Sequence, residues 1–544
     1  MINSFITLFR TDFKIILFWL SKRPISKIIV IIGFLLLFIL IDRIIYSSTF
    51  IIFSFFKSTG VFGRLTALYI LHTSIIMLIW FAIVSIMLTT ISRFLRINSI
   101  ISFLITLPIS PTIIVSWIFF KTFIMNIILL FIFIMPILIG YANVFFEKIS
   151  FSFLSIIFIV ISIISFFTTS IGTILGYIIV LLFKTSVKKS LMIYGIFLLI
   201  SGITIIKLIY PSNIKLFDYT KGLPEFQKIF HSLPLGYKLN PTYWLIDSIV
   251  SGLDMRIFIL LFFVAILTIF TIKMISNRFI IVFQRLQEYR IVNNSNKENR
   301  IKILISLQEL FKITNYPIFL KDIISILRLS SEIGFAIFIA SLTIVFFILN
   351  FVISNKVSES SLFHEQIILF FFSSFMFFAT AYLLRFSFPL IAREGGSAWF
   401  IFTQPISKNK ILKEKLILSL IISIPFFILN LFIWEFYKFI ENNIFFIILT
   451  SITLLSIVFS TIIIGAISPN FDENKDAERI STSGPGLLSL ALNIIIVLIN
   501  GYVLHLFINN QQLFLISFLS IFFGNAIIVL FIYFIFSKNN NYQF

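Results

Sequence analysis

Cysteine is absent from the 544 residues of this chain, and charged residues make up only 12% of it. The lack of cysteine excludes disulfide bonds, metal sites with thiolate ligands and catalysis by a cysteine nucleophile. The few charges leave too little polar surface for a soluble fold, because 59% of the residues are hydrophobic and 73 are phenylalanine. With a mean hydropathy of +1.11, this composition is typical of an integral membrane protein and excludes a large soluble enzyme.

Residue patterns for metal and sugar chemistry are also missing. The four histidines share no metal-ligand spacing: His72, His231, His364 and His505. The first predicted outside loop, Lys57–Arg64, has no acidic residue, which counts against a membrane glycosyltransferase. A membrane acyltransferase with His505 as its base remains an alternative.

Long apolar runs are abundant. Runs of about 20 residues match the thickness of the hydrocarbon core of a bilayer, and the sequence predicts twelve of them. They cover about 28–50, 65–91, 121–139, 152–183, 190–208, 257–275, 333–353, 366–384, 416–434, 444–467, 486–506 and 513–536. The first 20 residues have no signal-peptide cleavage site and instead predict an amphipathic helix lying in the headgroup plane.

The Lys and Arg residues predict the orientation. Placing the N-terminus inside puts most of them in cytoplasmic segments, as the positive-inside rule requires. Both termini are then cytoplasmic. The heavy use of Ile, Phe, Asn and Lys indicates a bacterium with an AT-rich genome, and the expected location is the bacterial cytoplasmic membrane. This bias, with contact to anionic lipid, explains the net charge of +20, so no nucleic-acid partner is expected.

Short polar elements repeat about 300 residues apart. Leu107-Pro108-Ile109-Ser110 and Gln404-Pro405-Ile406-Ser407 each follow an Arg-Phe pair and precede an apolar run. Phe9-Arg10-Thr11-Asp12 likewise pairs with Phe319-Leu320-Lys321-Asp322. These ordered matches predict an all-α membrane protein of two parallel six-helix halves, 1–275 and 310–544, joined by a cytoplasmic linker, 276–309. Each half would begin with an amphipathic interfacial helix.

The cytoplasmic turn Arg385–Lys415 carries the most information. Arg393-Glu394-Gly395-Gly396 places two glycines after a charged pair, which predicts a sharp bend. Pro405 would end this segment, and Ser407 would cap a short basic helix over Lys408–Lys415. Such a helix under the membrane offers a surface that a cytosolic protein could push.

These motifs resemble the cytoplasmic segment of ABC-2 type transporter permeases, the membrane subunits of bacterial ABC exporters. Arg393-Glu394-Gly395, Pro405-Ile406-Ser407 and Lys415 match its Arg-Glu-Gly stretch, its Pro-hydrophobic-Ser element and its Lys. Asn240-Pro241-Thr242-Tyr243-Trp244 is similar to its external Pro-Trp segment. The first half departs from the pattern, because Arg96-Ile97-Asn98 lacks the Glu-Gly.

The resemblance implies a permease that moves a lipid, a peptide or another hydrophobic compound across the membrane. The chain has no Gly-x-x-x-x-Gly-Lys-Ser/Thr phosphate loop. ATP would therefore be hydrolysed by a separate cytosolic ATPase subunit, and the chain itself would be no enzyme and would hold no cofactor or metal. A secondary transporter with 6+6 repeats is the alternative, although the few buried acidic residues count against it.

The same resemblance implies two sets of site residues. Exposed residues of the two cytoplasmic turns would contact the ATPase: Arg393, Glu394, Gly395, Pro405, Ser407 and Lys408, with Arg96, Pro108 and Ser110 in the first half. Pro241 and Trp244 would form an external gate. The second half, with its complete Arg-Glu-Gly stretch, would make the stronger contact.

Overall fold

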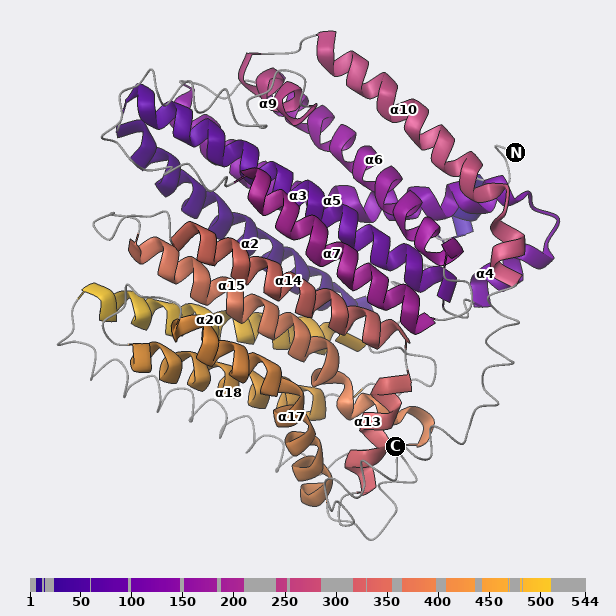
Figure 1. Ribbon diagram of the computed structural model, residues 1–544. Coiled ribbons are helices and arrows are strands. Elements are labelled where there is room, and N and C mark those ends of the chain that lie inside the picture. Colours follow the sequence, from indigo (N-terminus) through magenta and orange to yellow (C-terminus); the bar gives the residue numbers. More distant parts are fainter. Residues whose placement is uncertain are drawn as a thin grey trace. The chain divides into compact units, whose positions relative to one another are not determined.

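The computed structural model is built from long helices (Figure 1). It describes residues 6–11, 14, 24–58, 60–95, 99–146, 151–182, 187–209, 241–251, 255–284, 317–328, 330–354, 364–397, 408–435, 443–467, 469, 480–481 and 483–509. No strand occurs in this part of the chain. The all-α prediction is therefore confirmed for these residues, as the near-continuous apolar runs require, since only helices and closed barrels satisfy their backbone within a bilayer.

Ten helices among the described residues are long and apolar enough to cross a membrane. They cover Thr66–Phe94, Pro111–Phe145, Phe153–Leu182, Lys189–Lys207, Met255–Ser276, Glu332–Val352, Ile368–Gly395, Lys410–Phe432, Phe445–Ile467 and Gly484–Leu506. Each coincides with a predicted span, so the chain is a membrane protein. The predicted span 28–50 lies inside a 35-residue helix, and the span 513–536 falls outside the described residues.

The chain forms two compact units. Unit 1 comprises Met1–Ile214 and Asp218–Lys297, and unit 2 comprises Lys215–Phe217 and Glu298–Phe544. The domain boundaries expected from the repeat, with a linker over 276–309, stay a prediction.

The helices of unit 1 are α2 (Pro24–Ser58), α3 (Val61–Leu95), α4 (Ser99–Thr106), α5 (Pro111–Phe145), α6 (Phe151–Leu182), α7 (Val187–Ile209), α9 (Pro241–Ser251) and α10 (Met255–Ser276). Helix α3 packs along α6, and α2 packs along α5 (Figure 1). Two glycines allow the first contact, since a Cβ added at Gly172 or Gly176 would lie 2.9 Å from a backbone oxygen of α3. The Gly-x-x-x-Gly pattern thus has α3 as its partner.

Unit 2 contains α13 (Pro317–Arg328), α14 (Ser330–Ser354), α15 (His364–Phe386), the 3₁₀ turns η2 (Phe388–Leu390) and η3 (Ala392–Ser397), α17 (Lys408–Glu435), α18 (Asn443–Ile467) and α20 (Gly484–Asn509). Helix α18 packs on both α17 and α20. Helix α13 contacts α14 and α17.

One asparagine in each unit ties neighbouring spans together. The Asn126 amide of α5 donates to the Thr168 hydroxyl of α6 over 2.8 Å. The Asn430 amide of α17 donates to the Ser451 hydroxyl of α18 over 3.0 Å. Interhelical hydrogen bonds of this kind hold helices together in lipid, where apolar surfaces gain little from meeting one another.

Candidate functional site

Seven charged side chains of unit 2, here called the ionic cluster, meet at one end of its helices. They are Lys321 and Asp322 of α13, Glu332 of α14, Arg385 of α15, Arg393 and Glu394 of η3, and Lys415 of α17. All except Lys321 are buried or nearly so. The cluster therefore links five elements through charge rather than through apolar contact alone.

Lys415 lies at the centre of the first group of contacts. Its Nζ is 2.5 Å from Asp322 Oδ2 and 2.5 Å from Glu394 Oε1, and it also donates to the Leu390 carbonyl over 3.0 Å. These three acceptors match the three N–H donors of an ammonium group. Lys321, which is half exposed, bonds Glu394 from the outer side. Lys415 thereby joins α17 to α13 and to the turn that follows α15.

Glu332 organises the second group. Its carboxylate lies 3.0 Å from Arg393 Nη2 and 3.6 Å from Arg385 Nε. Arg393 Nη2 also donates to the Arg385 carbonyl over 3.4 Å, and the Arg385 guanidinium stands 5.3 Å from the centre of the Phe335 ring. The first turn of α14 is thus fixed to the end of α15.

Burial of these charges is costly unless each has a partner. The three buried cations, Arg385, Arg393 and Lys415, are matched by three buried anions. Burial raises the pKa of the Asp322 carboxyl above its ordinary value, and the nearby Lys415 ammonium only partly offsets this effect. The cluster holds together only when all of its elements are in place.

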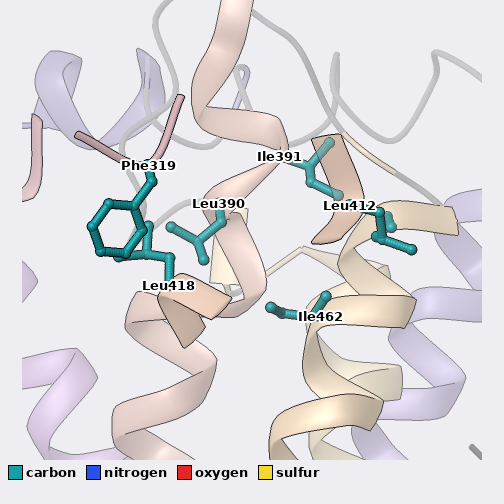
Figure 2. Close-up of a cluster of buried hydrophobic side chains, with 7 residues drawn as sticks. Phe319, Leu390, Ile391, Leu412, Leu418 and Ile462 are labelled. Atoms are coloured by element: carbon teal, nitrogen blue, oxygen red, sulfur yellow. The ribbon is translucent and has the colours of Figure 1, made fainter. Parts of the chain in front are cut away.

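An apolar layer lies beside the ionic cluster. It consists of Phe319, Leu390, Ile391, Leu412, Leu418, Ile462 and Ala466. Figure 2 shows Phe319 close to Leu390 and Leu418, with Ile391 and Leu412 on the other side of Leu390. Phe319, Ile391 and Leu412 each lie three residues, about one helical turn, from Asp322, Glu394 and Lys415 in turn. An apolar layer next to buried ion pairs strengthens them by lowering the local dielectric constant.

The bend predicted at the charged pair is present. Gly395 has φ +52° and ψ −137°, inside η3. This positive φ is readily adopted only by glycine. The bend turns Arg393 and Glu394 back toward the helices. The expectation that these two side chains are exposed on a cytoplasmic surface is therefore wrong, because both are held in ion pairs within the unit.

The basic segment expected after the second Pro-Ile-Ser element is not a separate short helix. Lys408 is the first residue of α17, which continues through Lys415 and Pro425 to Glu435 without a break. Lys410 and Lys413 are exposed in its first turns. Pro405 and Ser407 lie outside the described residues.

In unit 1 the corresponding element is a tight turn. Pro108 is exposed, and Ser110 is the residue before the first turn of α5, with its hydroxyl 3.0 Å from that of Thr112. Lys121 follows Pro108-Ile109-Ser110 in the first half as Lys415 follows Pro405-Ile406-Ser407 in the second. It is exposed and stands 5.0 Å from the Trp117 ring. No counterpart of the ionic cluster is seen among the described residues of unit 1, and Arg96 lies outside them.

Pro241 is the first residue of α9, and Trp244 lies one turn later and is half buried. Helix α9 contacts α3, α6 and α10. Tyr243 stacks on His72 of α3, with ring centres 5.7 Å apart. Helix α9, which begins at Pro241 and carries Trp244, is thus packed within unit 1, and the role of these two residues as a gate stays a prediction.

The sequence alone did not predict the partners of Lys415 and Arg393. Asp322 belongs to the repeated segment Phe319-Leu320-Lys321-Asp322, but no role follows from that, and Glu332 directly precedes the predicted span 333–353. One signal could have drawn attention to them. Glu332 and Lys415 lie at the ends of apolar runs, where an unpaired charge facing lipid would be costly.

A second feature is a pocket in unit 1, with about 520 Å³ of empty space that includes the part open to the surroundings. Its walls come from α3, α4, α5, α6, α10 and the helical stretch after α10. It is lined by Thr90, Arg93, Phe94, Ile101, Val115, Ile118, Phe119, Thr173, Ile272, Ile275, Phe279 and Phe283. No group of three or more His, Asp or Glu side chains that could hold a metal ion occurs in the part of the chain that the structure describes.

A family described as "Putative ATP-binding cassette" matches residues 21–537 of the chain. No curated protein and no solved structure matches it significantly. The family description refers to the ATP-binding component, and it overturns the recognition of the chain as an ABC-2 type permease and exporter subunit. It also overturns two related expectations: that the chain is no enzyme, and that ATP is bound only by a partner. The predicted ATPase partner stays a prediction.

The sequence constrains how this description applies. The 544 residues contain no Gly-x-x-x-x-Gly-Lys-Ser/Thr phosphate loop. A nucleotide site in this chain would therefore need other phosphate-binding residues. The family match covers nearly the whole chain, including all ten candidate spans. The chain belongs to the family described as "Putative ATP-binding cassette".

Proposed function

We propose that the chain is a membrane-embedded transport protein of the ATP-binding cassette class, in which ATP drives a change in the arrangement of the helices. The proposal includes twelve spans in two parallel halves, a bacterial cytoplasmic membrane and cytoplasmic termini. The observation that carries it is the family match along a chain with ten helices able to cross a membrane. A metal-dependent or histidine-based membrane enzyme has no such support.

In this proposal, the ionic cluster transmits motion between the helices of unit 2. Lys415 joins α17 to α13 and η3, and Glu332 joins α14 to α15 and η3. Displacing α13 would therefore carry the ends of α14, α15 and α17 with it, because separating them would leave buried charges unpaired. We infer that ATP-driven motion reaches the spans of unit 2 through this cluster.

The absence of cysteine permits a direct test. Spin labels on Phe103→Cys, in α4, and Lys410→Cys, in α17, report on the distance between the two units. Both positions are exposed. In native membrane vesicles, ATP with Mg²⁺ should change this distance distribution and AMP should not. The pair Phe103→Cys and Leu182→Cys, both in unit 1, is the matched control and should not respond.

A second measurement locates the nucleotide. A photoreactive ATP analogue is added to the chain purified alone, with excess ATP as competitor. Labelling that ATP prevents supports nucleotide binding by this chain, and the labelled peptides would reveal which residues replace a phosphate loop. Absence of labelling, together with identical distance distributions in ATP and AMP, would refute the proposal.

A further inference from the structure

The pocket in unit 1 combines an apolar interior with one fixed positive charge. Nine of its twelve lining residues are apolar, and none is acidic. Four of the nine are phenylalanines, contributed by α3, α5 and the stretch after α10. The empty space of about 520 Å³ includes the part that is open to the surroundings. An apolar lining of this kind suits a flexible hydrocarbon chain.

The three polar residues that line the pocket are all hydrogen-bonded to protein groups. The hydroxyls of Thr90 and Thr173 donate to carbonyl groups of their own helices. Arg93 Nη1 donates to Thr122 of α5 over 2.5 Å. Arg93 lies in the last turn of α3 and lines the pocket, and this bond fixes its guanidinium against α5. A positive charge is therefore held beside the apolar lining.

The surroundings of the pocket supply further positive charge. Lys273 lies in the last turn of α10, one residue after the lining residue Ile272, and Arg278 directly precedes Phe279. Both side chains are exposed. The pocket thus lies where spans end and basic residues gather, which is the depth of lipid headgroups. Basic pockets between membrane helices favour anionic lipid headgroups over neutral ones.

We infer that this pocket holds one acyl chain of an anionic phospholipid, with the lipid phosphate beside Arg93. The phenylalanine and isoleucine side chains would surround the hydrocarbon. The guanidinium would pair with the phosphate, for which its planar arrangement of donors is suited. The surrounding bilayer supplies this occupant. The site does not depend on the proposed transport function, because it requires only that unit 1 lies in a membrane.

The test uses the purified full chain and phospholipids with a photoreactive diazirine in the acyl chain. Phosphatidylglycerol is the anionic probe, and phosphatidylcholine is the neutral one. Cross-linked peptides are identified by mass spectrometry. We expect phosphatidylglycerol to label peptides containing Phe119 or Phe279 at least threefold more than phosphatidylcholine does. Unlabelled phosphatidylglycerol should compete, whereas inorganic phosphate should not.

Two variants test the two parts of the site. Ile118→Trp fills the pocket and should remove most of its labelling, while labelling around Phe262 on the exposed face of α10 continues. Ile124→Trp is the matched control, because Ile124 lies on the same helix, is exposed and does not line the pocket. This control should leave pocket labelling unchanged.

Arg93→Gln should abolish the preference for phosphatidylglycerol and leave labelling at the level of phosphatidylcholine. Arg93→Lys should restore part of the preference, since it retains the charge. Arg256→Gln removes a positive charge at the other end of α10 and should have no effect. Equal labelling by both lipids, labelling spread evenly over exposed helix faces, or labelling unaffected by Ile118→Trp would each overturn the inference.

Discussion

At the scale of single residues, the most demanding feature of this chain is a lysine with almost no exposure to solvent. Lys415 is 1% exposed and is surrounded by two carboxylates and a carbonyl. Removing one partner from a buried ion pair costs about 3–5 kcal/mol, because the remaining charge stays buried without compensation. Replacing a solvated charge costs at most about 1 kcal/mol. Because the two costs differ, substitutions of a buried and an exposed lysine can test whether the cluster is buried.

Lys415→Met should lower the free energy of unfolding by about 3–5 kcal/mol, since Asp322 and Glu394 would then face each other without the ammonium. The measurement is equilibrium unfolding in mixed detergent micelles. Lys413→Met is the matched control, because Lys413 lies on the same helix and is exposed. It should change stability by no more than about 0.5 kcal/mol. Equal effects of the two changes would contradict the buried cluster.

The sequence pointed to the correct turn but not to the role of its charges. Arg393-Glu394-Gly395 could be recognised as a charged pair before a bend, and the bend is present. The pair was expected to be exposed because it lies in a polar turn between apolar spans. Whether such charges face the cytosol depends on partners elsewhere in the chain. Asp322 and Glu332 both lie more than 60 residues before Glu394 in the sequence, and only the folded unit brings these side chains together.

At the scale of elements, the helices follow closely from the apolar runs. Ten predicted spans coincide with ten observed ones, because a helix in a bilayer needs a run of apolar residues of one characteristic length. Their ends were less predictable. Helix α5 begins at Pro111 and α17 at Lys408, well before the apolar runs expected from residues 121 and 416. The first turns of α17 are rich in lysine, and such turns are easily mistaken for loops when only hydropathy is considered.

Close contacts between elements depend on glycines at particular places. A Cβ added at Gly465 of α18 would lie 2.3 Å from the Phe388 carbonyl oxygen of η2. In unit 1, Gly172 of α6 meets α3 in the same manner. Each glycine thus allows its helix to approach another element of the same unit closely.

Gly465→Ala should therefore destabilise unit 2 by about 1–3 kcal/mol, the usual cost of forcing additional volume into a packed interior. The backbone oxygen of Phe388 cannot move aside as a flexible side chain would. Gly501→Ala is the control, since its Cβ would meet nothing closer than Phe372 at 3.6 Å. That change should stabilise α20 by about 0.5–1 kcal/mol through its helix propensity. Thermal unfolding of both variants in detergent measures the effects, and a neutral Gly465→Ala would contradict the close approach.

At the scale of the whole molecule, composition alone gave the class, because a chain with 59% hydrophobic residues has no other stable environment than a membrane. The family assignment from motifs was less secure. Pro-Ile-Ser and Arg-Glu-Gly are short and degenerate, and the match to the "Putative ATP-binding cassette" family corrected what they suggested. Short motifs report local turn geometry, which many membrane proteins share.

The orientation in the membrane also belongs to this scale, and it rests on charge. Moving Lys and Arg across the bilayer is costly, so the loop between α2 and α3 should be outside and the start of α17 inside. Ser58→Cys and Lys410→Cys place the only cysteine of the chain at exposed positions on these two segments. A membrane-impermeant maleimide added to intact cells should label Ser58→Cys and spare Lys410→Cys.

Permeabilised cells provide the control for this measurement, because both cysteines should then react to a similar extent. The same reagent also tests the ionic cluster, since Lys410 lies on the helix that Lys415 connects to α13. If Lys410→Cys reacts from inside only, the cluster lies at the cytoplasmic end of unit 2, where an ATP-driven motion could reach it. Labelling of Lys410→Cys in intact cells, with Ser58→Cys spared, would reverse the topology and separate the cluster from the compartment that contains ATP.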